Sequence, residues 1–208
     1  MKKLMILIFG LIAALTRPVS AAVVADFFVL PEADALLPFT DRDNRLDLLE
    51  YYRAEGVESR VASSLFPESI LKITSLTDSA MTVSGKGVTI DIAMFLPTPG
   101  DTLIVVSTNF EVGGRTDSDV EFFDSNLHSK GFLHQPSYTE WIVPSARKNL
   151  SPRLIESVPF ITSKAVLDHA ECAVIFENTT ETEFAESKDL FLPSVTYRYV
   201  KDKFRQMK

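Results

Sequence analysis

From Val88 to Asn109 the sequence reads VTIDIAMFLPTPGDTLIVVSTN, and this stretch decides the fold class. Val88–Leu96 and Thr102–Asn109 are rich in β-branched and aliphatic residues, which favours strands. Pro97–Asp101 lies between them and is typical of a turn. Because so short a connection cannot cross over between parallel strands, the two strands are predicted to form an antiparallel hairpin.

Similar runs of β-branched, aliphatic and aromatic residues occur on both sides of this hairpin. Further strands are predicted at Ile70–Ser75, Ala80–Ser84, Asp119–Phe123, Tyr138–Val143, Cys172–Glu177 and Ser194–Tyr199. Short polar or glycine-containing gaps join the strands of the first half, so that half is predicted to be an antiparallel meander. The single cysteine, Cys172, is expected to be a buried thiol within a strand.

An amphipathic helix is predicted ahead of the strands, over residues 41–54. Thr40 is the expected N-cap, apolar residues recur at helical spacing as far as Tyr52, and Gly56 closes the segment. The fold class is therefore α+β, with an antiparallel β-sheet meander packed against an N-terminal amphipathic helix.

The second half of the chain is less regular. Ser151–Val158 is predicted to form a short helix and the acidic stretch Asn178–Lys188 an exposed loop. The similar tetrapeptides Met94–Pro97 and Leu190–Pro193 raise the alternative of two related helix-plus-strands halves. No low-complexity linker divides the sequence, so a single α+β domain is expected over residues 22–208.

An export signal is predicted at the start of the chain. Two lysines follow Met1, an apolar run extends from Leu4 to Leu15, and small residues precede a cleavage site after Ala21. The run has 12 residues, whereas a membrane-spanning helix needs about 20. Residues 1–21 are therefore predicted to be a cleaved signal peptide. The mature chain is expected to be periplasmic or secreted, soluble, and without a transmembrane segment.

The charge of the mature chain disfavours two classes of partner. Cleavage would remove three of the 21 lysines and arginines and none of the 28 acids, so the net charge would fall from −7 to −10. Nucleic acids and anionic lipids are bound through clustered Lys and Arg side chains. No nucleic-acid partner is therefore expected.

Several stretches occur together in this chain: Leu30-Pro31, Leu37-Pro38, Asn44–Leu48, Val105–Thr108, Asp117-Ser118, Glu121–Asp124, and the aromatic tail Val195–Tyr199 with Phe204. Together they resemble an exported bacterial family, catalogued as domain of unknown function 3256. The resemblance implies an envelope location in Gram-negative bacteria of the kind that colonise animal guts. It implies no activity or cofactor, and it supplies no catalytic residue.

Two tripeptides are similar to the O-glycosylation sequon that some exported proteins of such bacteria carry. The sequon is Asp-Ser/Thr-apolar, and it occurs here at Asp78–Ala80 and Asp101–Leu103. Ser79 and Thr102 are accordingly candidate glycosylation sites, because both fall at predicted turns that a transferase could reach.

Five residues are candidates for a metal site: Asp117, Asp119, Glu121, His128 and His134. In a strand the three acids would point to one face, where their oxygens suit Ca²⁺, and the histidines suit a transition metal. The competing interpretation is that Val120 and Phe122 face the core and the acids face solvent.

No complete catalytic or cofactor motif occurs in the sequence. The Gly-x-Ser-x-Gly elbow of serine hydrolases is absent, and Ser84–Gly87 is typical of a hairpin turn. No cofactor is therefore expected. The leading hypothesis is a non-catalytic exported envelope protein that binds a protein, peptide or glycan partner. The alternatives are a periplasmic hydrolase with a dispersed carboxylate or metal site, and a protein inhibitor presenting the loop Pro97–Asp101.

Overall fold

The computed structural model describes residues 23–35, 37, 39–54, 60–62, 69–147, 158, 160–180 and 189–207. The predicted signal peptide lies outside these residues. So do the predicted helix at Ser151–Val158, apart from Val158, and most of the predicted loop at Asn178–Lys188.

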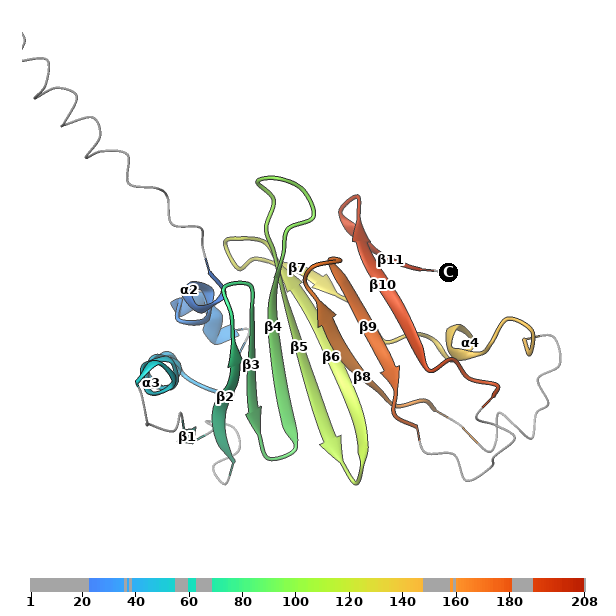
Figure 1. Cartoon of the computed structure of the whole chain (residues 1–208), viewed down its shortest axis with the longest axis horizontal. Coiled ribbons are helices and arrows are strands. Elements are labelled where there is room, and N and C mark those ends of the chain that lie inside the picture. Colours follow the sequence, from blue (N-terminus) through green and yellow to red (C-terminus); the bar gives the residue numbers. More distant parts are fainter. Residues whose placement is uncertain are drawn as a thin grey trace, which may run out of the picture.

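Most of the described chain forms two antiparallel sheets (Figure 1). The first has seven strands that pair in chain order: β1 Val61–Ala62, β2 Ile70–Leu76, β3 Ala80–Gly85, β4 Val88–Phe95, β5 Leu103–Val112, β6 Arg115–Phe123 and β7 Ser129–Phe132. The second has four strands, which also pair in chain order: β8 Ser163–Asp168, β9 Ala173–Asn178, β10 Ser194–Val200 and β11 Lys203–Gln206. The predicted antiparallel sheet is confirmed, and the predicted hairpin is β4–β5, with Met94 paired to Ile104.

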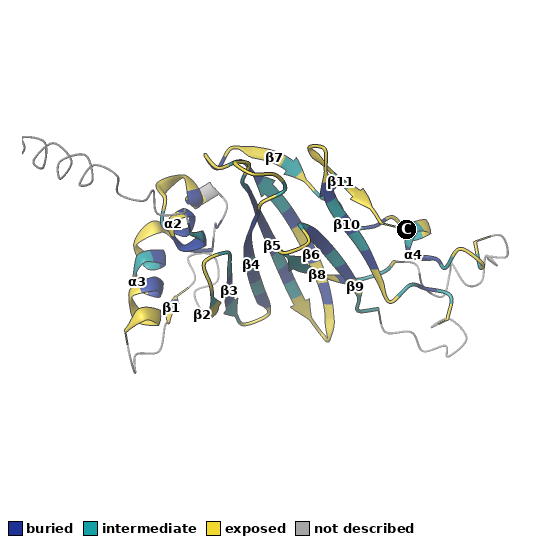
Figure 2. Ribbon diagram, turned by 45° about the horizontal axis from the view of Figure 1, so that its top comes forward, coloured by how far each residue is buried: buried dark blue, intermediate teal, exposed yellow. Residues whose placement is uncertain are grey.

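The central strands β4 and β5 are buried on both faces, which explains the long apolar run in the sequence. Ile92 and Ile104 point into one hydrophobic core, which the first sheet shares with the N-terminal helices. Phe95 and Val105 point into a second core, which the first sheet shares with the second sheet. The molecule thus has three layers: helices, a seven-stranded sheet and a four-stranded sheet (Figures 1 and 2).

In the described part of the chain, the N-terminal layer contains the short helices α2 Val24–Phe28, the 3₁₀ helix η1 Pro31–Ala35 and α3 Arg42–Arg53. The N-cap of α3 is Asp41 and not the predicted Thr40, because an Asp41 carboxylate oxygen accepts a hydrogen bond from Asn44 N at 2.8 Å. Leu48 and Leu49 of this helix are buried, whereas Tyr52, predicted on the apolar side, is 40% exposed.

The predicted strand Tyr138–Val143 is wrong. Tyr138–Trp141 forms the short helix α4, and Ile142 then makes one isolated bridge to Phe191. The reason is a capping box: Glu140 Oε2 accepts from both Ser137 N at 2.7 Å and Ser137 Oγ at 2.6 Å.

The turn between β8 and β9 contains Cys172, which was expected within a strand. Cys172 is half-buried and has a left-handed φ of 48°, so the strand begins only at Ala173. Burial raises the pKa of its thiol. Among the described residues, no helix is both long and apolar enough to cross a membrane.

Candidate functional site

A groove of about 520 Å³ opens where the two sheets meet, and we call it the intersheet groove. Its walls come from the start of β5, the end of β6, β7, and the β10–β11 hairpin. Figure 2 shows β7 and β11 on the same, upper side of the molecule. The groove therefore joins segments from the middle and the end of the chain.

Aromatic side chains form the floor of the intersheet groove. The ring centroids of Phe122 and Phe204 lie 5.2 Å apart, and those of Tyr199 and Phe204 also lie 5.2 Å apart. The three rings meet one another at angles of 66–72°, which are edge-to-face contacts. Phe132 stands at the border and is 59% exposed.

Charged side chains line the rim. Asp101, Asp124 and Asp202 contribute acids, and Lys130 and Lys203 contribute bases. Burial raises the pKa of the Tyr199 hydroxyl, and the carboxylates of Asp202 and Asp101 raise it further. The carboxylates of Asp101 and Asp202 therefore both act electrostatically on Tyr199.

Two turns place these rim acids. Thr98–Asp101 is closed by a hydrogen bond from Asp101 N to Thr98 O at 3.0 Å, and Gly100 supplies the φ of 87° that this turn needs. Lys201 and Asp202 link β10 to β11 with φ of 52° and 61°, which is the backbone of a type I′ turn.

The acids proposed from the sequence as metal ligands lie on the outward face of β6. Asp117 and Asp119 are exposed and Glu121 is half-exposed, while Val120 is buried. Gln135 donates a hydrogen bond to Asp117, and Ser129 Oγ donates to Glu121 Oε1 at 2.6 Å. This alternation agrees with the interpretation in which the core faces one side of β6 and the acids the other.

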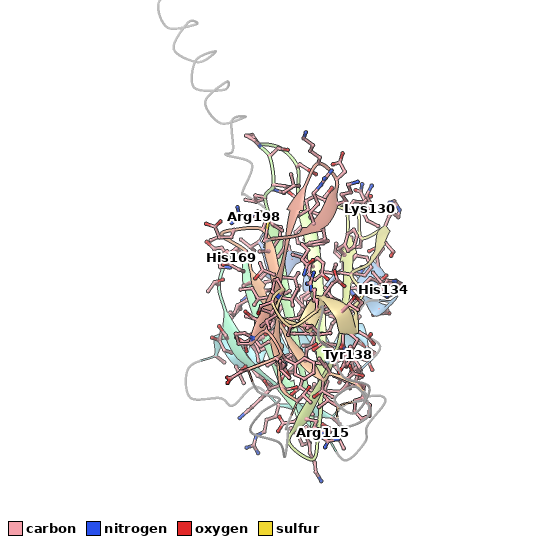
Figure 3. The ribbon with its side chains drawn as sticks, turned by 90° about the vertical axis from the view of Figure 1, so that its right-hand side faces the viewer. Arg115, Lys130, His134, Tyr138, His169 and Arg198 are labelled. Atoms are coloured by element: carbon pink, nitrogen blue, oxygen red, sulfur yellow. The ribbon has the colours of Figure 1, made fainter. Side chains whose placement is uncertain are left out.

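The two candidate histidines lie in different places. His128 is 3.5 Å from Asp124, whose pKa is lowered chiefly by the hydrogen bond from the His128 backbone N–H. His134 borders a separate cavity of about 310 Å³ together with Asp117 and Asp119. In Figure 3, His134 lies on the same side of the molecule as Lys130, opposite His169. Within the described part of the chain, no three His, Cys, Asp or Glu side chains are arranged to hold a metal ion.

A buried polar network joins the two sheets, and sequence reasoning missed it. Asn109 Oδ1 accepts from Ala165 N at 2.9 Å, and Asn109 Nδ2 donates to Ala165 O at 3.1 Å. Ser118 Oγ lies 2.8 Å from Ser163 O. Side chains of β5 and β6 thus satisfy backbone groups along β8, the first strand of the second sheet. That edge of β8 is therefore already occupied by side chains of the first sheet.

Asp91 is attached to the same network. It accepts from Thr82 Oγ1 at 2.7 Å and from Asn109 Nδ2 at 3.4 Å. Burial raises its pKa above the usual 3.8, although these hydrogen bonds and the positive charge of Lys164 oppose the shift. The sequence signal for this network was the presence of polar residues, Asp91, Ser107 and Asn109, within otherwise apolar strands. Buried polar groups of this kind need hydrogen-bond partners.

The two candidate glycosylation residues lie at turns, as expected. Ser79 is half-buried in the β2–β3 turn, and its carbonyl accepts from Met94 N at 2.8 Å. Thr102 is half-buried just before β5 and lines the intersheet groove.

Two antiparallel sheets, with helices on the outer face of the larger one, define a mainly β class of protein. A solved structure shares this fold: "Structure of a domain of an uncharacterized protein from Porphyromonas gingivalis W83" matches with a TM-score of 0.66. The match covers 87% of this chain and 96% of that chain at 18% sequence identity, a level that shows a common fold and nothing further. No family model matches the chain, and no curated protein matches it.

Proposed function

We propose that this chain is a non-catalytic exported protein of the bacterial envelope, periplasmic or secreted, that binds a protein, peptide or glycan partner in the intersheet groove. The observation that carries the proposal is the groove itself: about 520 Å³, with an aromatic floor, a charged rim and the exposed ring of Phe132 at its border. Concave sites with an apolar lining and a few polar groups are the usual places for ligands.

The chemistry of the rim supports binding over catalysis. Catalysis by two groups needs an acid and a base within reach of one reacting atom. The Asp124 carboxylate accepts hydrogen bonds from the backbone N–H groups of Asn126 at 2.9 Å and His128 at 3.0 Å. It therefore stabilises the turn that follows β6. Asp101 and Asp202 have no histidine beside them among the residues that line the groove.

We also propose that the chain belongs to the exported family catalogued as domain of unknown function 3256. We further propose that residues 22–208 form one α+β domain, with two related helix-plus-strands halves as the alternative. Support for the halves is that each sheet pairs in chain order and follows a helical segment, α3 before the first sheet and α4 before the second.

A pull-down with two matched surface variants tests the binding proposal. Phe132→Ser changes the groove, whereas Val112→Ser changes the tip of the distant β5–β6 hairpin, where Val112 is 79% exposed. From an envelope extract, the wild-type chain and Val112→Ser are expected to retain the same partner and Phe132→Ser to lose it. Equal retention by all three proteins would reject the groove as the binding site.

A hydrolase is the second candidate, since the smaller cavity brings Asp117, Asp119 and His134 together. Gln135 already binds Asp117, which leaves Asp119 and His134 as the pair to test. If this cavity is catalytic, a substrate panel will reveal a hydrolysis that Asp119→Asn and His134→Gln each abolish without loss of folding.

A further inference from the structure

We propose that the intersheet groove takes an extended peptide segment of a partner protein and holds one of its Lys or Arg side chains beside Tyr199 and Phe204, near Asp101 and Asp202. This inference rests on the binding function proposed above and names the class of ligand.

The carboxylates of the rim suit an organic cation. Asp101 and Asp202 make no ion pair within the described chain, yet both act on the Tyr199 hydroxyl. They do not converge with a third ligand on a metal site within the described residues. Carboxylates attract the charged head of a Lys or Arg side chain, while its apolar stem can pack along the ring edges that line the groove.

The arrangement of the aromatic rings disfavours a sugar as the ligand. Stacking of a sugar requires an open ring face, and the faces and edges of Phe122, Tyr199 and Phe204 are directed at one another. Tyr199 is only 8% exposed. A compact side-chain cation with a narrow apolar stem fits such a floor better than a sugar ring does.

Both sheets present an outer strand to the groove. β7 is the last strand of the first sheet and β11 the last of the second, as far as the described residues extend. An outer strand has backbone N–H and C=O groups available to an extended peptide, which can pair with it as an added strand. The β8 edge lacks this capacity because Asn109 and Ser118 occupy it.

The charges of the rim favour a peptide with a single basic side chain. Lys130 on β7 and Lys203 on β11 repel a second basic group, whereas Asp101 and Asp202 attract the first. The chain as a whole carries a net charge of −7, which favours encounter with a basic segment.

Selection from a library of randomised heptapeptides displayed on phage tests the proposal with the whole mature chain as bait. The enriched peptides are expected to alternate β-branched residues with polar ones. They should also carry Lys or Arg at one fixed position. Synthetic versions should bind Asp101→Asn/Asp202→Asn at least about tenfold more weakly than the wild type. The variant Glu50→Gln/Glu111→Gln, which loses the same charge elsewhere, should bind like the wild type.

Three results would overturn the inference: no enrichment, enriched peptides that lack a basic residue, or equal affinity for both double variants. Methylating alternate backbone nitrogens of the best peptide should abolish binding, and unchanged affinity would reject pairing with β7 or β11. If these tests fail while Phe132→Ser still loses its envelope partner, the groove binds another class of ligand and the proposed binding function stands.

Discussion

Arg45 organises the N-terminal layer at the scale of a single residue. It is fully buried, and its guanidinium donates to Phe28 O at 2.7 Å, Thr40 O at 3.0 Å and Leu30 O at 3.1 Å. It also pairs with Asp34 at 2.6 Å. One side chain thus satisfies carbonyls from α2, from the segment that follows it and from the approach to α3.

Replacing Arg45 by Met is expected to lower the free energy of unfolding by roughly 3–5 kcal/mol, because several buried acceptors lose their donor. Urea denaturation measures this loss. Arg42→Met in the same helix removes one bond, from Arg42 Nε to Val29 O at 3.1 Å, at an exposed site, and should cost less than about 1 kcal/mol. Equal costs would contradict the role given to Arg45.

Asp91 should make stability decrease as pH rises. Because burial raises its folded-state pKa, its contribution is complete below the unfolded pKa near 3.8 and is lost as pH rises through the higher folded value. Above about pH 4 the wild type should therefore become progressively less stable relative to Asp91→Asn. Unfolding by urea at several pH values measures it, and a constant difference would refute the assignment.

Glu140 should make stability increase as pH rises, the opposite of the effect of Asp91. Burial alone would raise its pKa, but hydrogen bonds from Ser137 and Tyr197 and the charge of Arg147 outweigh burial and lower it below 4.5. Its contribution is present above the unfolded pKa and is lost as pH falls through the lower folded value. The wild type should lose more stability than Glu140→Gln on acidification below about pH 5, and an equal loss in the two proteins would count against this coupling.

Residue roles of this kind were only partly predictable from the sequence. Val120 could be placed inside and Asp119 outside from alternation alone, because a strand has a period of two. Arg45 could not be placed, since its burial depends on carbonyls 5 to 17 positions away in the sequence. The residues of the groove floor lie on β6, β10 and β11, and no local pattern connects them.

At the scale of an element, the β10–β11 turn contains local backbone strain. Lys201 and Asp202 both occupy the left-handed region, which costs a non-glycine residue about 1 kcal/mol and which asparagine tolerates better. Lys201→Asn should raise the free energy of unfolding by about 0.5 kcal/mol, and Lys201→Val should lower it by roughly 1–2 kcal/mol. Thermal unfolding compares the two, and the reverse order would show that the turn is unstrained.

Elements were predicted well where periodicity and turn residues agreed, and badly where side-chain hydrogen bonds decided the outcome. The strands β2 to β6 follow the predicted ranges within a few residues, and glycine or proline marks the turns β3–β4, β4–β5 and β5–β6. The helix α4 was predicted as a strand because Tyr138–Val143 is aromatic and apolar, and the bond from Ser137 to Glu140 overrides that propensity. β7 and β11 have four residues each, too few for a periodic signal.

At the scale of the whole molecule, the arrangement of layers creates the site. The second sheet packs on the first through β8, and the polar contacts of Asn109 and Ser118 hold it there. The β10–β11 hairpin then lies next to β6, as the 5.2 Å contact of Phe122 with Phe204 shows, and it shares the groove lining with β7. Antiparallel strands were predictable from the sequence, but their division into two packed sheets was not, and the groove exists only because of that division.

Site-specific photo-crosslinking in the native envelope tests the central claim most directly. A benzoyl-phenylalanine at position 132 lies at the border of the intersheet groove, and the same group at position 112 lies on the exposed tip of the β5–β6 hairpin. The binding account predicts a discrete adduct from position 132 and none from position 112. An adduct from position 112 alone would contradict it.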